Sequence, residues 1–346
     1  MSRQGKPTGW SLALKWSALA VLVTAAVLAA GIGLWLNTAM PLAAPRVELS
    51  IEPGTSPREV AQAWVKAGVQ APTWALYQWF RLSGQAKRIR AGSYELEHGI
   101  TPRGLLAKMV QGDEAFERLR LIEGWTWAQC RAELARSPKM RQTGATLDDA
   151  ELMAAIGLPG VPPEGRFFPD TYVYSRGVSD LTVLRRAAQA MERRLATVWA
   201  ERAADLPLRN EAEALTLASI IEKETGQRDE RGLVAGVFIN RLRLGMPLQT
   251  DPSVVYGLGK SFSGRLQTRD LRADTPFNTY TRNGLPPTPI AMPGLAALRA
   301  AVKPEPTKAL YFVARGDGSS VFSNDLATHN RAVNQYQRNV NSGSKQ

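Results

Sequence analysis

The longest apolar run of the chain lies close to its N-terminus. From Trp16 to Leu36, 21 residues carry no charge and are almost wholly apolar. A helix needs about 20 such residues to cross the hydrocarbon core of a bilayer. Three basic residues precede the run, and none follows it before Arg46. The pattern predicts a transmembrane signal anchor at residues 16–36, with residues 1–15 in the cytoplasm and everything after the span exported.

Two other interpretations of this run are weaker. The apolar region of a cleaved signal peptide is about 7–15 residues long, and no clear small-x-small cleavage site precedes Pro45. A buried core helix does not explain why basic residues stand in front of an apolar segment at the N-terminus. We therefore expect an uncleaved anchor.

After a Pro/Ala linker at residues 37–45, the pattern predicts a small α+β domain at residues 46–124. Apolar and polar residues alternate from Val47 to Ile51, as in a half-buried strand. Ser56 followed by Glu59 is the signature of a capping box. The same order of strand, cap and helix then recurs. The predicted elements are strands near residues 47–51, 94–96 and 119–121, and helices at residues 57–67, 73–82 and 102–111.

The remainder of the chain predicts a larger mixed α+β domain at residues 125–340, followed by a disordered tail at residues 341–346. An extended aromatic segment covers residues 164–172, and an Arg-Gly-Asp-Gly sequence predicts the turn of a β-hairpin. The fold class is therefore α+β behind one membrane helix. Helices are predicted at residues 127–134, 146–156, 181–202, 212–225 and 328–340, and the hairpin strands at 309–314 and 320–323.

Composition and charge exclude several classes of protein. The single cysteine, Cys130, rules out a disulfide framework, and the two separated histidines, His98 and His329, leave no cluster with zinc-ligand spacing. No cofactor or metal is expected. The net charge of +12 is typical of nucleic-acid binding, but an exported domain rarely meets nucleic acid. Anionic lipid or an acidic cell-wall polymer is the more fitting partner.

The segment from Ala212 to Thr225 combines an apolar helix with two carboxylates near its end. Glu222 shares a stripe with Leu215 and Ser219, whereas Glu224 lies about 200° further round the helix. The two cannot converge on one bond, so the helix offers one catalytic carboxylate at most. Burial of that group favours its protonated form, as a proton donor at neutral pH requires. A structural ion pair is the alternative, and spacing does not choose between Glu222 and Glu224.

Two loops downstream gather polar side chains. Asp251 is expected to cap a helix that has Pro252 at its first position. Asn278 and Tyr280 precede a proline-rich stretch at residues 284–294, whose stiffness holds neighbouring side chains in place. Such residues bind sugar hydroxyls, but they also cap turns, and both interpretations stay open here.

The stretches LASIIEKET, VAGVFINRLRLGMPLQTDPSVVYGLG and FNTYTRNGLPPTPIAMPG, in this order, closely resemble the endolytic murein transglycosylases of the YceG-like family. EGRFFPDTY and the C-terminal helix containing His-Asn are similar too. The resemblance covers nearly the whole chain. It implies a bacterial inner-membrane enzyme with a LysM-like domain at residues 46–124 and a catalytic domain at residues 125–340.

What the resemblance implies for the chemistry is non-hydrolytic cleavage of peptidoglycan glycan strands. The β-1,4 bond after N-acetylmuramic acid breaks, and its C6 hydroxyl closes a 1,6-anhydro ring. The first glutamate of the EKET motif, Glu222, is the expected general acid and then base. Partnership with peptidoglycan synthases, limiting the length of nascent strands, is also implied. Family motif positions expected near the glycan are Gln249, Asp251, Asn278, Tyr280 and Glu164.

Three other functions compete with this one. A catalytically silent peptidoglycan-binding scaffold would use Glu222 only for structure. A hydrolytic muramidase would leave reducing ends in place of anhydro ends. A nucleic-acid-binding protein would show steep salt dependence, and it ranks last because the anchor exports the basic domain.

Overall fold

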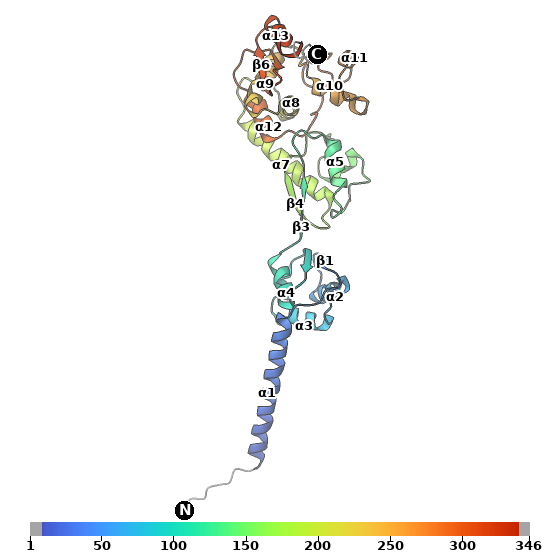
Figure 1. The fold of residues 1–346 in the computed structure, drawn as a ribbon, viewed down its shortest axis with the longest axis vertical. Coiled ribbons are helices and arrows are strands. Elements are labelled where there is room, and N and C mark those ends of the chain that lie inside the picture. Colours follow the sequence, from blue (N-terminus) through green and yellow to red (C-terminus); the bar gives the residue numbers. More distant parts are fainter. Residues whose placement is uncertain (1–8, 339–346) are drawn as a thin grey trace, which may run out of the picture. The chain divides into compact units, whose positions relative to one another are not determined.

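The computed structural model describes residues 9–338, which form two compact units (Figure 1). Unit 1 runs to Glu117 and includes Ser175–Gly177, and unit 2 comprises Arg118–Tyr174 and the chain from Val178 onward. The fold class is mixed α+β, as predicted. The predicted tail at residues 341–346 and part of the predicted cytoplasmic segment lie outside the described residues.

Unit 1 contains the long N-terminal helix and most of the strands and helices predicted for the small domain. Its elements are α1 (Gly9–Asn37), β1 (Arg46–Ile51), α2 (Pro57–Ala67), α3 (Thr73–Leu82), a 3-10 turn η1 (Ala86–Arg88), β2 (Gly92–Glu97) and α4 (Pro102–Gln111). Strand β3 (Phe116–Arg120) follows at the boundary with unit 2.

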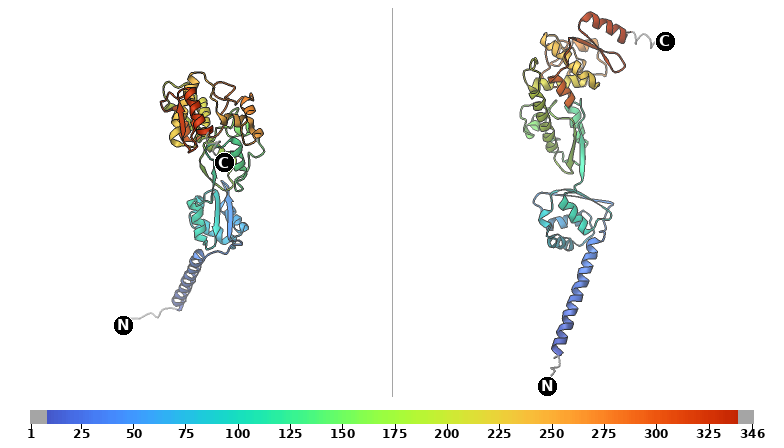
Figure 2. Two further views of the ribbon diagram at one scale, coloured as in Figure 1. Left: turned by 45° about the horizontal axis from the view of Figure 1, so that its top comes forward. Right: turned by 90° about the vertical axis from the view of Figure 1, so that its left-hand side faces the viewer.

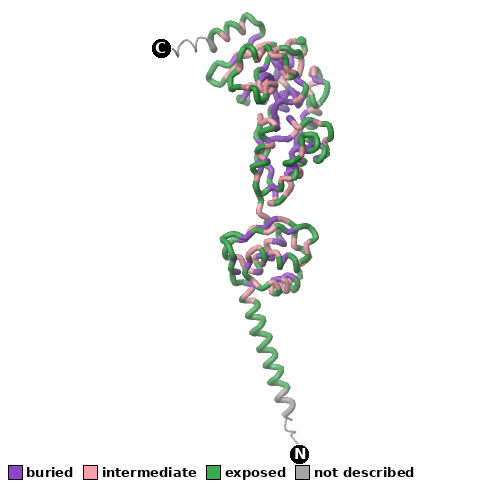
Figure 3. Tube along the Cα trace, turned by 90° about the vertical axis from the view of Figure 1, so that its right-hand side faces the viewer, coloured by how far each residue is buried: buried purple, intermediate pink, exposed green. Residues whose placement is uncertain are grey.

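The long N-terminal helix α1 is apolar enough to cross a membrane over Leu14–Asn37. Figure 3 shows most of the helix coloured as exposed residues. Only its C-terminal end packs into unit 1, where Leu36 is buried and Met40 just beyond the helix donates its backbone N–H to Ile100 O at 2.8 Å. The helix is therefore compatible with a single-pass anchor, as expected.

The core of unit 1 lies between an antiparallel strand pair and three helices (Figure 2). In the β1–β2 register Val47 is opposite Leu96 and Leu49 is opposite Tyr94. Ser56 and Glu59 form the predicted capping box of α2, because each side chain bonds the other residue's backbone N–H. The LysM-like character of this domain and its predicted boundaries at residues 46 and 124 stay predictions.

Unit 2 is built mostly from helices. They are α5 (Trp127–Ala135), α6 (Asp149–Ala155), α7 (Asp180–Ala200), α8 (Glu211–Glu224), η2 (Arg228–Glu230), α9 (Arg231–Arg243), α10 (Asp251–Leu258), η3 (Gly259–Ser261), α11 (Thr268–Arg272), α12 (Leu295–Val302), α13 (Leu326–Val333) and a π-helical turn η4 (Asn334–Arg338). Its strands are β4 (Thr171–Ser175), which pairs with β3, and the antiparallel pair β5 (Tyr311–Ala314) and β6 (Ser320–Ser323).

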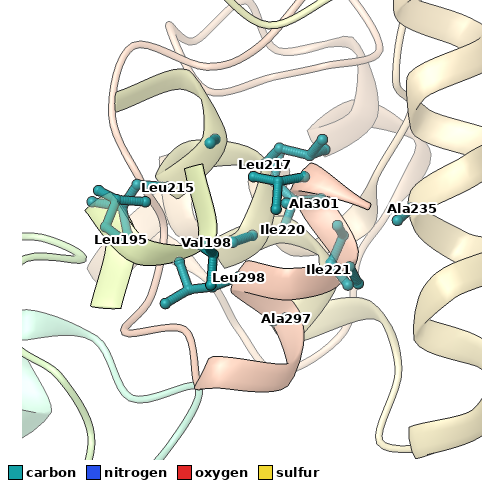
Figure 4. Packing of buried hydrophobic residues seen from close by; sticks show 14 of the residues in the cluster. Leu195, Val198, Leu215, Leu217, Ile220, Ile221, Ala235, Ala297, Leu298 and Ala301 are labelled. Atoms are coloured by element: carbon teal, nitrogen blue, oxygen red, sulfur yellow. The ribbon is translucent and has the colours of Figure 1, made fainter. Parts of the chain in front are cut away.

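Helix α8 is the central helix of the larger core in unit 2. Every residue from Ala214 to Ile221 is buried, so the helix is covered on all sides. Figure 4 shows Leu217 of α8 beside Ala301 of α12, and Leu298 of α12 beside Val198 of α7, all within one cluster. A helix fixed in this way holds the residues of its last turn in defined positions.

The structure corrects some details of the predicted elements. Asp251 is the first residue of α10, and Thr250 occupies the cap position, so Pro252 is second in the helix. Helices α9 and α12 were not predicted, because their apolar residues give no clean one-sided pattern when neighbours cover several faces. The C-terminal helix begins at Leu326 and becomes a π-helical turn at Asn334.

Candidate functional site

The last turn of α8 carries two glutamates that lie in different surroundings, as their helical spacing predicts. Glu222 and Glu224 follow directly on the buried stretch that ends at Ile221. The negative end of the helix dipole lies here, and it disfavours carboxylates over carboxylic acids. Which glutamate is available to a substrate depends on the neighbours of each.

Glu222 is held by protein groups on both carboxylate oxygens. Gly294, which caps α12, donates its backbone N–H to Oε2 at 2.9 Å, and Arg231 Nη2 lies 3.4 Å from Oε1. The side chain is only 6% exposed. Burial raises the pKa of Glu222, and the Gly294 N–H and Arg231 partly oppose that shift. Glu222 thus links α8 to the first residues of α9 and α12.

Glu224 lines a cavity of about 580 Å³ in unit 2. Burial raises its pKa to about 7, the negative charge of Asp251 adds to this, and Thr250 and Arg241 oppose it. Both Glu222 and Glu224 have intermediate exposure as whole residues, so it is the lining of this cavity that distinguishes Glu224. A carboxyl group with a pKa near neutrality exists in both protonation states at physiological pH, as acid–base catalysis requires.

Three of the residues expected near the glycan line this same cavity. They are Gln249, Asp251 and Tyr280. The Tyr280 hydroxyl donates to Asp251 Oδ1 at 2.6 Å, which connects the start of α10 to the loop before the proline-rich stretch. Burial and the nearby Asp251 raise the pKa of Tyr280, so the phenol stays protonated. The cavity therefore presents the carboxyl groups of Glu224 and Asp251 beside polar groups that can bind sugar hydroxyls.

Gln249 has a strained backbone at the edge of the cavity. Its φ of 53° makes it the only non-glycine residue with positive φ in the described part of the chain. This conformation costs about 1–3 kcal/mol and often occurs at functional sites. Gln249 N donates to Thr279 O at 3.0 Å, and Thr250 N donates to the Thr279 hydroxyl at 3.0 Å. These hydrogen bonds to Thr279 hold the strained backbone of Gln249 in place.

Arg241 of α9 is a cavity residue that the sequence did not single out. It is 7% exposed and donates to Leu310 O at 2.7 Å, Leu248 O at 2.9 Å and Gln249 Oε1 at 3.2 Å. Its guanidinium also lies over the Tyr311 ring, 5.0 Å from the centroid. In the sequence Arg241 follows Asn240 and stands two residues before Arg243, so no local signal set it apart.

The C-terminal hairpin and α13 supply another wall of the cavity. Tyr311 stacks on His329 with ring centroids 5.1 Å apart, and Asn330 lies beside them. Burial lowers the pKa of His329, and the positive charge of Arg241 lowers it further. The imidazole is therefore neutral at physiological pH. The His-Asn pair, noted only as part of a motif, belongs to the site.

Asn278 does not line the cavity. It is fully buried, and its amide donates to the backbone oxygens of Leu271 at 3.0 Å and Ala273 at 2.7 Å. Its Oδ1 accepts the backbone N–H of Tyr280 at 2.9 Å. These bonds occupy the side chain within its own loop, so in this structure Asn278 positions Tyr280 and has no group facing a glycan.

Glu164 is also buried away from the cavity. Its carboxylate accepts the backbone N–H of Trp127 at 3.0 Å and the hydroxyl of Tyr256 at 3.1 Å. Burial raises the pKa of Glu164 to about 7, against the effect of these two donors. In this structure Glu164 therefore connects the start of α5 to α10 through these two hydrogen bonds.

No set of three side chains suited to holding a metal ion occurs within the described residues. Cys130 is fully buried in the core, and burial raises the pKa of its thiol to about 12.

Comparison with known proteins gives a consistent result. The model of the YceG-like family matches residues 49–335. A protein of Bacillus subtilis (strain 168) named endolytic murein transglycosylase is 32% identical over 310 residues, which are 84% of each chain. A protein of the same name from Streptococcus pneumoniae strain D39 is 27% identical, over 83% of this chain and 58% of that protein.

A crystal structure of a YceG-like protein from Listeria monocytogenes is similar as well. It shares 29% of its sequence with this chain at a TM-score of 0.55, and the alignment covers 83% of this chain and 98% of that one. The chain belongs to the YceG-like family.

Proposed function

We propose that this protein is an endolytic peptidoglycan lytic transglycosylase in which Glu224 is the single acid–base residue. It would cut the β-1,4 bond between N-acetylmuramic acid and N-acetylglucosamine and leave a 1,6-anhydromuramoyl end. Two curated relatives named endolytic murein transglycosylase support the activity. The observation that carries the residue assignment is the cavity that joins Glu224 to Gln249, Asp251 and Tyr280.

This assignment differs from the expectation that Glu222 is catalytic, which nothing here tests directly. Glu222 uses its oxygens for the Gly294 N–H and for Arg231, and it does not line the cavity. A proton donor must reach the oxygen that it protonates. Glu224 meets this condition better, because it faces the cavity and has a pKa of about 7.

One carboxyl group is sufficient for the reaction. Protonated Glu224 donates its proton to the glycosidic oxygen, and the bond from this oxygen to C1 of N-acetylmuramic acid breaks. The C6 hydroxyl oxygen of the same sugar then attacks C1. The Glu224 carboxylate accepts the hydroxyl proton, so the residue ends the cycle protonated and no water is consumed. Gln249 and Tyr280 would hold sugar hydroxyls during these steps.

Hydrolysis is a second candidate, because Asp251 lines the same cavity as Glu224. A retaining glycosidase uses one carboxyl group as acid and a second one as nucleophile. The Tyr280 hydroxyl, however, donates to Asp251 Oδ1 at 2.6 Å, which lowers the nucleophilicity of that oxygen. The two mechanisms leave different products.

The test is product analysis by mass spectrometry after incubation of the full chain in detergent with purified peptidoglycan. We expect anhydromuramoyl ends from the wild type and from Glu222→Gln, and none from Glu224→Gln. Anhydro ends that disappear only in Glu222→Gln would overturn the residue assignment. Reducing ends that disappear in Asp251→Asn would establish hydrolysis. No product from a folded, glycan-binding wild type would favour a scaffold.

We further propose that α1 anchors the protein in the bacterial inner membrane, with its N-terminus in the cytoplasm and the chain after α1 outside. The basic residues before the span and their absence directly after it support this orientation. In this position the enzyme would cut strands as peptidoglycan synthases release them. Longer glycan strands in cells carrying Glu224→Gln are the expected result, and unchanged strand length would contradict this role.

A further inference from the structure

One face of α3 in unit 1 exposes large apolar side chains. Trp74 is 72% exposed and Leu82 is 79% exposed, although Leu76 and Phe80 on the opposite face are fully buried. Trp74, Arg81 and Leu82 lie within an arc of roughly 100° on the helix. These three residues form what we call the α3 face. An exposed tryptophan and leucine beside an arginine are typical of helices that lie in a membrane interface.

A basic cavity adjoins the α3 face. It has a volume of about 540 Å³ and is lined by Arg58, Arg81 and Lys87, with Tyr77 between them and no acidic side chain. Among the residues that the structure describes, none of the three cations has a carboxylate within salt-bridge distance. The segment from Arg81 to Arg90 contains four basic residues and no acidic one. Unpaired cations around a cavity favour an anionic ligand.

The C-terminal end of the apolar helix α1 lies close to α3. Met40 donates its backbone N–H to Ile100 O at 2.8 Å, and the Trp79 indole of α3 donates to Pro102 O at 3.0 Å. Both bonds therefore reach the short segment from Ile100 to Pro102, where α4 begins. If α1 crosses the bilayer, α3 lies near the plane where the chain leaves the hydrocarbon core.

We propose that the α3 face and the basic cavity form a second membrane contact, which binds anionic lipid headgroups of the bilayer that α1 crosses. Trp74 and Leu82 enter the interface, while Arg58, Arg81 and Lys87 bind lipid phosphates. The inference rests on the proposed membrane anchor and is independent of the catalytic assignment. Its consequence is that unit 1 is fixed against the membrane surface by more than the single helix.

The experiment uses the full chain in nanodiscs of phosphatidylcholine alone or of an equal mixture with phosphatidylglycerol. Hydrogen–deuterium exchange is measured over residues 73–90. We expect exchange roughly tenfold slower or more in the anionic discs, because several basic residues act at the lipid surface together. The triple variant Arg58→Gln, Arg81→Gln, Lys87→Gln should lose this protection, and Trp74→Ser with Leu82→Ser should weaken it.

The matched control removes the same charge from exposed sites of unit 2, with Arg136→Gln, Arg265→Gln and Arg272→Gln, and should keep the protection. Equal exchange in both discs would overturn the proposal, as would an equal loss of protection in the control. Protection by peptidoglycan fragments in neutral discs would identify a cell-wall ligand and overturn the lipid assignment. The lipid-site triple variant should cleave strands normally in detergent, which separates this result from failure of the enzymatic proposal.

Discussion

The two carboxylates in the last turn of α8 have opposite surroundings. Around Glu222, the Gly294 N–H and Arg231 take up the carboxylate oxygens, and the side chain is 6% exposed. Around Glu224, the neighbours are cavity residues such as Gln249 and Asp251. Burial raises the pKa of both glutamates. A raised pKa therefore does not distinguish the two glutamates, whereas only Glu224 is among the residues that line this cavity.

The largest expected effect is on the rate of strand cleavage. Glu224→Gln removes the ionisable group while keeping the shape of the side chain, so cleavage should fall roughly 10²–10⁴-fold. Glu222→Gln should retain most of the activity. Both rates are measured from anhydromuramoyl ends released by the detergent-solubilised chain. A larger loss of cleavage rate in Glu222→Gln than in Glu224→Gln would instead make Glu222 the acid–base residue.

For stability we expect the reverse: substitution of Glu222 should destabilise the fold more than substitution of Glu224. Glu222→Ala leaves Arg231 and the Gly294 N–H without their partner and should lower the free energy of unfolding by about 2–4 kcal/mol. Glu224→Gln removes a charge that interacts with the buried Arg241, but Arg241 keeps its hydrogen bonds to backbone oxygens, so the change should be smaller, about 1 kcal/mol. Urea unfolding followed by circular dichroism checks this prediction.

Arg241→Lys should disturb the cavity while both glutamates keep their side chains. A lysine cannot reproduce the fork of donors that reaches Leu310 O, Leu248 O and Gln249 Oε1. We expect a loss of about 1–3 kcal/mol of stability from the unsatisfied carbonyl groups, together with slower cleavage. Wild-type activity in a destabilised Arg241→Lys variant would show that the arginine serves only folding.

The pH dependence should report the titration of Glu224. Because its acid form donates the proton and its pKa is about 7, cleavage should decline as the pH rises through about 7. Glu164 also has a pKa of about 7 in the folded state. The unfolded chain ionises both groups near 4.5, so folding binds protons between these values, and stability falls as the pH rises across that window.

Variants separate the contributions of Glu224 and Glu164 to the pH dependence of stability. Glu224→Gln and Glu164→Gln should each remove part of the slope of unfolding free energy against pH, worth about 1–3 kcal/mol per group over the window. Only Glu224→Gln should abolish the activity. An unchanged slope in both variants would contradict the raised pKa values.

The smallest expected effect concerns the strained backbone at Gln249. Glycine adopts a φ of 53° without the steric cost that glutamine meets. Gln249→Gly should therefore be more stable than Gln249→Ala by about 1 kcal/mol, and both should cleave more slowly than the wild type because the amide is lost. Equal stability of the two variants would show that this backbone is not strained.

Local patterns predicted much of the secondary structure. The strand at Val47–Ile51, the capping box of Ser56 and Glu59, and the helix Thr73–Leu82 were all predicted from short-range rules and are confirmed. Helices α9 and α12 were missed. Their surfaces are determined by neighbours distant in sequence, and no local periodicity reveals which faces those neighbours cover.

The candidate site was predicted in part. Gln249, Asp251 and Tyr280 do line one cavity, whereas Asn278 and Glu164 are buried and bonded elsewhere. All five are polar residues in loops or at the ends of elements, and the motif alone does not say whether such a side chain faces a ligand or its own backbone. Whether such a side chain faces the cavity or bonds nearby backbone groups depends on how the surrounding loops fold.

The sequence by itself determined the apolar helix at the N-terminus, the mixed α+β class and the divergence of Glu222 from Glu224, because each follows from composition or from the geometry of one helix. Only the tertiary structure decided which glutamate has access to a cavity. Gly294, Arg231 and Gln249 lie up to 72 residues from these glutamates, and folding alone brings them to the end of α8. The same fold brings α3 close to the end of α1, since contacts between distant segments arise only when the core packs.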